Sequence, residues 1–252
     1  MNRNELERFL EDSLESAKFE DYSPNGLQVE GRQEISRIIT GVTASQALLD
    51  AAILRGADTL IVHHGYFWKG ESPRIVGYRR QRLATLLRHD LNLFAYHLPL
   101  DAHPTLGNNA RWAAALGWQT QGHFGAQDIG CWGELPGEGC TLAELAAQLR
   151  ETLGRPPLVI GEATRPLKRI AWCSGGAQNY IEAARALGVD AYLSGEISEQ
   201  TPHVARETGL AYLACGHHAT ERFGPQALAE AVQATFAAAG VTCEFVEVEN
   251  PA

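Results

Sequence analysis

The sequence predicts an α/β protein made of two similar α/β domains, with mixed sheets flanked by helices. Three observations support this prediction: short apolar, β-branched runs alternate with helical segments, turn and cap residues separate them, and one strand–helix–strand unit occurs twice. Such alternation is typical of mainly parallel or mixed sheets that are covered on both faces. The 252 residues are enough for two domains of ordinary size, each with its own core.

The first elements are bounded by clear turn and cap signals. A helix is predicted over residues 4–17, and Ser23-Pro24-Asn25-Gly26 then forms a turn. Ser45 is placed to cap the next helix, and Gly56 follows its end. The remaining elements predicted before residue 96 are strands near Leu27–Val29, over Ile35–Thr40, over Thr59–His64 and over Leu91–Ala95, and helices over Gln46–Arg55 and Arg79–Arg88.

The segment His97–Asp101 is predicted to be a strand end that runs into a loop, because Pro99 forbids a helix interior. Asn108 or Asn109 is then predicted to cap a helix that Gly117 ends. These residues close the first predicted domain, which covers residues 1–125.

The second predicted domain covers residues 126–252 and repeats the alternation. Its elements outside the repeated unit are strands over Ile129–Leu135, Pro157–Ile160 and Thr242–Val248, and helices over Thr141–Thr152 and Pro225–Ala239. Pro225 suits a first helical turn and Gly240 suits a helix end. Whether the last strand stays in this domain or crosses back to the first is left open by the sequence.

An internal duplication supports the prediction of two domains. Arg37–His64 aligns with Arg169–Glu196 at an offset of 132 residues without a gap, and 7 of 28 positions are identical. The identical pairs are Arg37/Arg169, Ile38/Ile170, Gln46/Gln178, Ala51/Ala183, Ala52/Ala184, Gly56/Gly188 and Asp58/Asp190. Both copies have the order strand, loop, helix, Gly, Asp, strand, so duplication explains the likeness better than chance.

The composition excludes several classes of protein. The formal charge of −9 argues against non-specific electrostatic binding to nucleic acid or to anionic membranes. The first residues predict an amphipathic helix rather than a secretory signal, and no apolar stretch approaches the roughly 20 residues that span a bilayer. Five cysteines, with no C-x-x-C pair, fit reduced thiols better than a disulfide framework. We therefore expect a cytoplasmic protein.

The pair His63-His64 follows the apolar run Thr59–Val62 and precedes Gly65. Ligands of open α/β sheets bind beyond the carboxyl ends of the strands, so two imidazoles placed there indicate a metal site. Successive strand residues point to opposite faces, and both rings reach one site only if the backbone bends, which Gly65 permits. Otherwise, one histidine is an internally satisfied polar group and the other faces solvent.

The duplication adds further metal-ligand candidates. Both copies end a strand with His-x-x-x-carboxylate, as His97 and Asp101 in the first copy and His217 and Glu221 in the second. Only the first copy has the histidine pair, because the second has Gly195-Glu196 at these positions. Two related domains that face each other would bring together five candidate ligands, namely His63, His64, Asp101, His217 and Glu221.

Imidazole and carboxylate ligands together suit Zn, Mn, Fe, Co or Ni. Five or more ligands exceed the three that one catalytic zinc needs, so a pair of divalent ions is the natural alternative.

Three motifs resemble one known family, the Nif-three-like family, and within it the bacterial YbgI type. They are Ile61-Val62-His63-His64-Gly65-Tyr66-Phe67-Trp68, His97-Leu98-Pro99-Leu100-Asp101 and Gly216-His217-His218-Ala219-Thr220-Glu221. The likeness covers essentially the whole chain, including Pro24-Asn25-Gly26-Leu27-Gln28. Members often bear the name GTP cyclohydrolase 1 type 2 homologue. The resemblance implies a Nif-three-like fold, a homohexameric ring and a dinuclear metal centre with ligands at His63, His64, Asp101, His217 and Glu221.

His97 is the candidate catalytic residue, as a general acid or base that also orients Asp101, with direct metal ligation as the alternative. His218 is expected at the rim of the site. Ser194–Glu199 either lines the same cleft or forms a turn without chemistry. Cys215 is expected to be buried and inert.

Two classes of function remain after these arguments. The first is a metal-dependent hydrolase that acts on a nucleotide or a related small heterocycle, in the manner of a type 2 GTP cyclohydrolase. A phosphoesterase linked to nucleic-acid damage would use the same groups. The second is a non-catalytic metal-binding or metal-handling scaffold, since imidazole and carboxylate ligands also serve storage. Di-iron oxidative chemistry is a third possibility.

Overall fold

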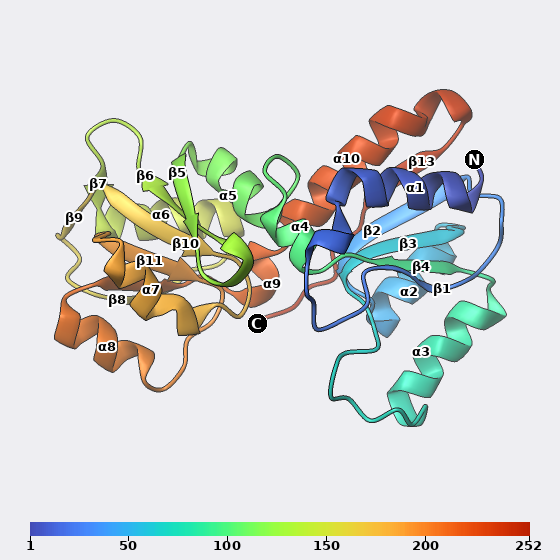
Figure 1. Ribbon diagram of the computed structural model, residues 1–252, viewed down its shortest axis with the longest axis horizontal. Helices are drawn as coiled ribbons and strands as arrows, with labels where there is room; N and C mark the ends of the chain where they lie inside the picture. The colour runs from blue at the N-terminus through green and yellow to red at the C-terminus, as the bar shows by residue number, and fades with distance from the viewer. The chain divides into compact units, whose positions relative to one another are not determined.

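The computed structural model describes all 252 residues and consists of two compact units (Figure 1). The first unit comprises Met1–Leu100 and Gly224–Glu249, and the second comprises Asp101–Phe223 and Asn250–Ala252. These units differ from the division predicted after residue 125, because residues 101–125 belong to the second unit and a C-terminal segment returns to the first.

The first unit contains a five-stranded mixed sheet with the order β1-β4-β3-β2-β13. β1 is antiparallel to β4, and the other neighbours are parallel. Helices α1 and α10 cover one face and α2 and α3 lie on the other (Figure 1). The strands are β1 (Gly26–Val29), β2 (Arg37–Thr43), β3 (Thr59–His64), β4 (Asn92–Ala95) and β13 (Thr242–Phe245). The last strand therefore pairs with β2 of the first unit, which answers the question that the sequence left open.

The second unit contains a six-stranded mixed sheet with the order β5-β6-β10-β11-β12-β8 and a two-stranded ribbon of β7 and β9. Only β10, β11 and β12 are mutually parallel. The strands are β5 (Gln119–Phe124), β6 (Gly130–Glu134), β7 (Cys140–Thr141), β8 (Leu158–Ile160), β9 (Pro166–Leu167), β10 (Arg169–Cys173), β11 (Ala191–Ser194) and β12 (Ala211–Ala214).

The helices confirm most of the cap predictions. Ser45 caps α2 by accepting a hydrogen bond from the Leu48 N–H, and Gly117 ends α5 at a φ of 69°. None of the helices has the length and the hydropathy needed to cross a membrane. The helices are α1 (Arg3–Leu14), α2 (Gln46–Leu54), α3 (Gly77–Arg88), α4 (Leu98–Ala102), α5 (Asn108–Leu116), α6 (Leu142–Leu153), α7 (Ile181–Ala186), α8 (Thr201–Thr208), α9 (His217–Thr220) and α10 (Phe223–Phe236).

Two predictions about the segment after β4 are wrong. Leu98–Ala102 forms the short helix α4 instead of a loop, because Pro99 occupies its first turn, where the missing N–H breaks no helical hydrogen bond. The N-cap of α5 is Gly107, whereas Asn108 and Asn109 lie inside the helix with buried side chains. Both asparagines are used for contacts beyond the helix.

The repeated unit has the same topology and register in both copies. Ile38 of β2 pairs with Thr59 of β3, and Ile170 of β10 pairs with Ala191 of β11, which preserves the offset of 132 residues in both partners. An antiparallel strand also borders each third parallel strand, β1 beside β4 and β8 beside β12. The structure thus supports the predicted internal duplication.

One aspartate carboxylate holds the start of the first strand in each copy. Oδ2 of Asp58 accepts hydrogen bonds from the backbone N–H groups of Ser36 at 2.8 Å and Arg37 at 3.0 Å. Oδ2 of Asp190 accepts the equivalent bonds from Lys168 at 2.8 Å and Arg169 at 2.9 Å. We call this pair of backbone hydrogen bonds to one aspartate oxygen the bracket. Its presence in both copies explains why the aspartate is one of the seven identical pairs.

The two units have separate apolar cores. In the second unit, Trp112 of α5 and four leucines of α6 pack against Trp172 of β10. In the first, Leu48 and Leu49 of α2 pack against the apolar residues of β2, β3 and β4. The parallel strands are buried along nearly their whole length, so the polar residues at their carboxyl ends stand out as candidates for function.

Candidate metal centre

The first group of candidate ligands lies at the carboxyl ends of β3 and β4. His63 and His64 end β3, and His97 follows β4 after Tyr96. Ligand nitrogens of the three histidines lie within 4.8 Å of one another. The ring centroids of His63 and His64 are only 4.5 Å apart, so these neighbours turn toward one site despite the usual alternation along a strand.

Each of these imidazoles is held through its Nδ1 atom. Nδ1 of the fully buried His63 lies 3.0 Å from the Tyr96 carbonyl oxygen, and Nδ1 of His64 lies 3.1 Å from Oγ1 of Thr43. Nδ1 of His97 lies 2.7 Å from Oδ1 of Asp21. An oxygen at Nδ1 fixes the ring and leaves Nε2 for a metal or a proton, as is usual for metal-binding histidines.

A polar turn before β1 supports this group. Oδ2 of Asp21 accepts a hydrogen bond from the Leu98 N–H at 2.9 Å, and Oδ1 of Asn25 accepts one from the His97 N–H at 2.8 Å. Oε1 of Gln28 accepts from the Tyr66 N–H, just beyond Gly65. A Cβ at Gly65 would lie 2.2 Å from that oxygen, so this close approach requires glycine.

Asp21, Asn25 and Gln28 thus position the backbone on either side of the histidines, a role that was not predicted for them. Their hydrogen bonds connect residues 38–77 positions apart in the chain. Asn25 and Gln28 belong to the segment Pro24–Gln28 that carries the resemblance, whereas Asp21 lies outside it.

The second group of candidate ligands is Asp101, His217 and Glu221, all in the second unit. Nε2 of His217 lies 3.1 Å from Oε2 of Glu221, and carboxylate oxygens of Asp101 and Glu221 lie within 4.8 Å. Asp101 and Glu221 are only 5% and 3% exposed. Asn108 Nδ2 and Ser174 Oγ each donate to Oδ1 of Asp101 at 2.9 Å. The structure therefore gives Asn108 and Ser174 the orienting role that was predicted for His97.

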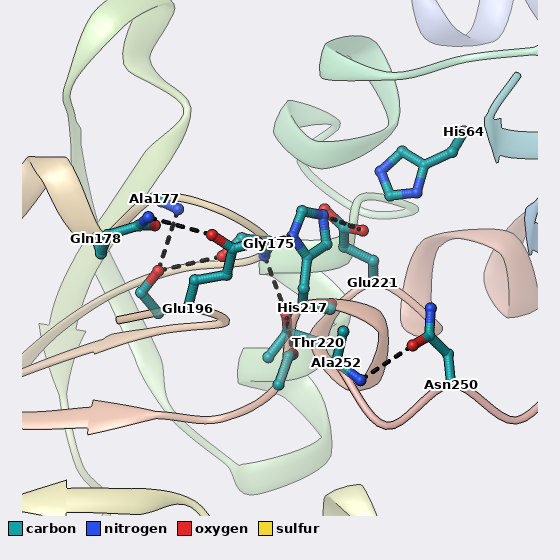
Figure 2. Close-up of polar contacts among 12 residues, drawn as sticks. His64, Gly175, Ala177, Gln178, Glu196, His217, Thr220, Glu221, Asn250 and Ala252 are labelled. Atoms are coloured by element: carbon teal, nitrogen blue, oxygen red, sulfur yellow. Dashed lines mark hydrogen bonds and ion pairs between the residues drawn. The ribbon is translucent and has the colours of Figure 1, made fainter. Parts of the chain in front are cut away.

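Glu196 contacts the His217 ring at Nδ1, on the side opposite to Glu221 (Figure 2). Its Oε1 lies 2.7 Å from Nδ1 of His217, and its Oε2 accepts from Nε2 of Gln178. Glu196 occupies the position of His64 in the repeat, so the segment Ser194–Glu199 does contribute to the site. The imidazoles that follow β4 and β12 are both anchored at Nδ1 by a carboxylate, Asp21 for His97 and Glu196 for His217.

The backbone after β10 makes room for this second group. Gly175 has a φ of +63°, and a Cβ there would lie 2.1 Å from Oε1 of Glu221. The Gly175 N–H also donates to Oγ1 of Thr220 at 3.0 Å, which ties the loop to α9 (Figure 2). Only glycine satisfies both the left-handed conformation and the contact with the carboxylate.

The carboxylates change the charge state of His217. Burial alone would lower its pKa, but Glu221 and Glu196 outweigh burial and raise the pKa to about 9. The metal-free ring is therefore an imidazolium that both glutamates stabilise at neutral pH. A metal ion that binds at Nε2 has to displace this proton.

Asp21 shows the opposite shift. Burial raises the pKa of its carboxyl, but the contacts with His97, Asn25 and the Leu98 N–H outweigh burial and lower the pKa to about 2. A carboxyl with a lowered pKa stabilises the fold above its ordinary pKa of 3.8, and this stabilisation disappears as the pH falls toward 2.

We expect Asp21→Asn to lower the free energy of unfolding by about 2 kcal/mol near neutral pH, with the loss shrinking as the pH falls through 3.8 toward 2. Urea denaturation of the chelator-treated protein across this range measures the difference. Asp12→Asn, on the exposed face of α1, is the matched control. A difference that stays constant with pH would contradict the assigned charge of Asp21.

The side chains of His218 and Cys215 are both buried. His218 is buried at 8% exposure, which contradicts its predicted place at the rim; its backbone N–H donates to the carbonyl of Ala252. Cys215 is fully buried, and burial raises the pKa of its thiol well above the ordinary value, in agreement with an inert role.

This fold and these residues identify the class of protein. The family model of Duf34/NIF3 (NGG1p interacting factor 3) matches residues 1–251, and the chain belongs to this family. The resemblance drawn from the motifs is therefore confirmed.

Particular relatives agree with this assignment. A Salmonella typhimurium protein is 53% identical over the full length of both chains, and a Pseudomonas aeruginosa protein is 52% identical over 95% of this chain and 94% of its own; both are named GTP cyclohydrolase 1 type 2 homolog. The solved structure of protein ybgI matches at a TM-score of 0.94 and 51% identity, with full coverage of both chains. The solved structure of TTHA1606 from Thermus thermophilus matches at a TM-score of 0.88 and 33% identity, also with full coverage.

Proposed function

We propose that the chain binds two divalent metal ions through His63, His64, Asp101, His217 and Glu221 and acts as a metal-dependent hydrolase on a nucleotide or a related heterocycle. The observation that carries this proposal is the cluster of three histidines at the ends of β3 and β4, each anchored at Nδ1. The buried carboxylates of Asp101 and Glu221 supply the oxygen donors that such ions need. The names of the relatives agree with cyclohydrolase chemistry.

Divalent ions at these donors would polarise the substrate and lower the pKa of water. The chain's own residues orient the site and move protons. Asn108 and Ser174 hold Asp101, and Glu196 holds His217. His97 is the proposed proton carrier: Asp21 holds its Nδ1, which leaves Nε2 to exchange the proton. In the cyclohydrolase case, water adds to C8 of a purine, one C8–N bond breaks and the released nitrogen takes up a proton, so that the imidazole ring opens.

Assembly into a homohexameric ring and a cytoplasmic location belong to the same proposal. The ring rests on membership of the family. The location rests on the odd number of cysteines and on the lack of a C-x-x-C pair, which fit reduced thiols.

The decisive experiment measures metal and turnover on the same preparation. Bound metal per chain is determined after loading with Mn, Zn or Fe, and GTP and a panel of phosphoesters are then assayed. Opening of the purine ring of GTP supports a cyclohydrolase, whereas hydrolysis of a phosphoester supports a phosphoesterase. Full metal occupancy without turnover of any compound would contradict the hydrolase and favour a metal-handling scaffold.

We expect His64→Ala to lower the metal bound per chain, because it removes one nitrogen ligand. It also removes the hydrogen-bond partner of Oγ1 of Thr43. The affinity for the ion should fall by at least about tenfold. Metal analysis after dialysis measures the effect, and His89→Ala, at an exposed position just after α3, is the matched control. Unchanged stoichiometry in His64→Ala would remove this residue from the site.

A further inference from the structure

A cavity of about 410 Å³ lies in the first unit beside His64. Its walls come from the end of β2, from the segment after β3 and from α3. This volume falls within the range of pockets that hold small molecules and is too small for a folded partner. Because His64 is one of the lining residues, a molecule held here lies next to a proposed metal ligand.

The cavity walls combine aromatic rings with positive charge. Tyr66, Phe67, Trp68 and Tyr78 supply the rings, and Arg74, Arg79 and Arg82 line the same space. Glu71 is the only carboxylate in the lining, and it pairs with Arg79. Arg74 and Arg82 form no ion pair, although acidic residues outnumber basic ones by 30 to 21 in the chain. Uncompensated arginines beside aromatic rings are the groups that recognise a planar anionic compound.

Two further features separate this cavity from ordinary surface. Phe67 and Tyr78 are 46% and 60% exposed, which is unusual for large rings that serve only packing. Phe67 also has a φ of 66°, a left-handed conformation that bulky residues rarely adopt. Such backbone strain concentrates at ligand-binding sites. The guanidinium of Arg82 lies 5.1 Å from the ring centroid of Tyr78, so charge and ring are presented together.

We propose that this cavity is the substrate-recognition pocket and takes a planar aromatic ring that bears a phosphate or a comparable anionic group. The ring packs among the four aromatic side chains, and Arg82 and Arg74 bind the anion. This inference rests on the proposed function because it places the bound ring beside His64. It goes further by assigning specificity to α3 and to the loop that precedes it.

The first experiment measures binding by calorimetry with three probes on the full-length, chelator-treated protein. Guanosine monophosphate combines the ring and the anion, whereas guanosine and ribose 5-phosphate each lack one of them. We expect guanosine monophosphate to bind at least about tenfold more tightly than either fragment. Equal affinity for guanosine monophosphate and ribose 5-phosphate would overturn the proposal, and so would no detectable binding of guanosine monophosphate.

The second experiment uses two pairs of variants on α3. Arg82→Gln should weaken guanosine monophosphate about tenfold and leave guanosine unchanged, whereas Arg80→Gln, exposed and outside the lining, should change neither. Tyr78→Ala should weaken both ligands about tenfold, and Leu87→Ala, which is 65% exposed on the same helix, should not. Equal affinities for Arg82→Gln and Arg80→Gln would overturn the assignment of the anion site.

These outcomes are separate from those of the hydrolase test. Binding that follows the variant pattern without any turnover would support the pocket and contradict the hydrolase. Turnover of GTP with an unchanged KM in Arg82→Gln would support the hydrolase and overturn the pocket. If Tyr78→Ala changes the sedimenting mass but not the affinity for guanosine monophosphate, the exposed rings form a contact between copies of the chain, and the pocket proposal fails.

Discussion

Glu221→Gln is expected to abolish turnover and to lower the metal bound per chain by half or more. The substitution keeps the size of the side chain but removes the negative charge that pairs with His217 at 3.1 Å. One carboxylate oxygen becomes an amide nitrogen, which cannot bind a metal ion, and because Glu221 is only 3% exposed, a water cannot easily take its place. We expect the rate to fall by more than about 100-fold in the proposed hydrolase assay.

A second measurement on this variant does not depend on activity. Glu221 and Glu196 together raise the pKa of His217 to about 9, so removing Glu221 should lower that pKa in the metal-free protein. Titration of the imidazole by nuclear magnetic resonance measures this shift, and circular dichroism checks the fold. Glu199→Gln, whose side chain is 87% exposed, is the matched control. Unchanged metal content and an unchanged His217 titration would contradict the role of Glu221.

Asp58→Ala is expected to destabilise the first unit by about 3 kcal/mol. The Asp58 side chain is 3% exposed, and its Oδ2 satisfies the backbone N–H groups of Ser36 and Arg37 at the start of β2. Alanine leaves both donors without their acceptor. Asp190→Ala removes the same bracket in the second unit, but Asp190 is only half-buried, so we expect a smaller loss of about 2 kcal/mol.

Urea denaturation, followed separately by probes in each unit, measures these losses. Asp50→Ala is the control, because Asp50 is exposed on α2 and accepts a hydrogen bond only from Gln46. It should change the free energy of unfolding by less than about 0.5 kcal/mol. A loss in Asp58→Ala no larger than in Asp50→Ala would show that the bracket does not stabilise the strand.

The parts of the fold that local chemistry determines could be predicted from the sequence. Ser45 and Gly117 mark their helix ends because each acts on its immediate neighbours. The repeated unit was visible because its buried strands need apolar residues and its bracket needs one aspartate. The histidines at the ends of β3 and β4 could also be predicted as candidates, because the apolar runs of these strands show where each strand ends.

The parts that depend on distant contacts could not be predicted. Pro99 argues against a helix interior, yet α4 tolerates it in the first turn. Asparagine favours the N-cap position, but the side chain of Asn108 donates to Asp101 instead. Asp21 meets His97 across 76 positions of the chain, and nothing near Asp21 indicates that partner.

The paired brackets at Asp58 and Asp190 have a consequence for how such a chain can diversify. The amino ends of the equivalent strands carry the same hydrogen bonds in both units, while the carboxyl ends carry His63-His64 in one and Gly195-Glu196 in the other. The two copies thus differ in the ligand atoms at the ends of their strands but share the hydrogen bonds that hold the starts of these strands. A protein engineer can follow the same route, grafting new ligands at the strand tips while leaving both aspartates in place.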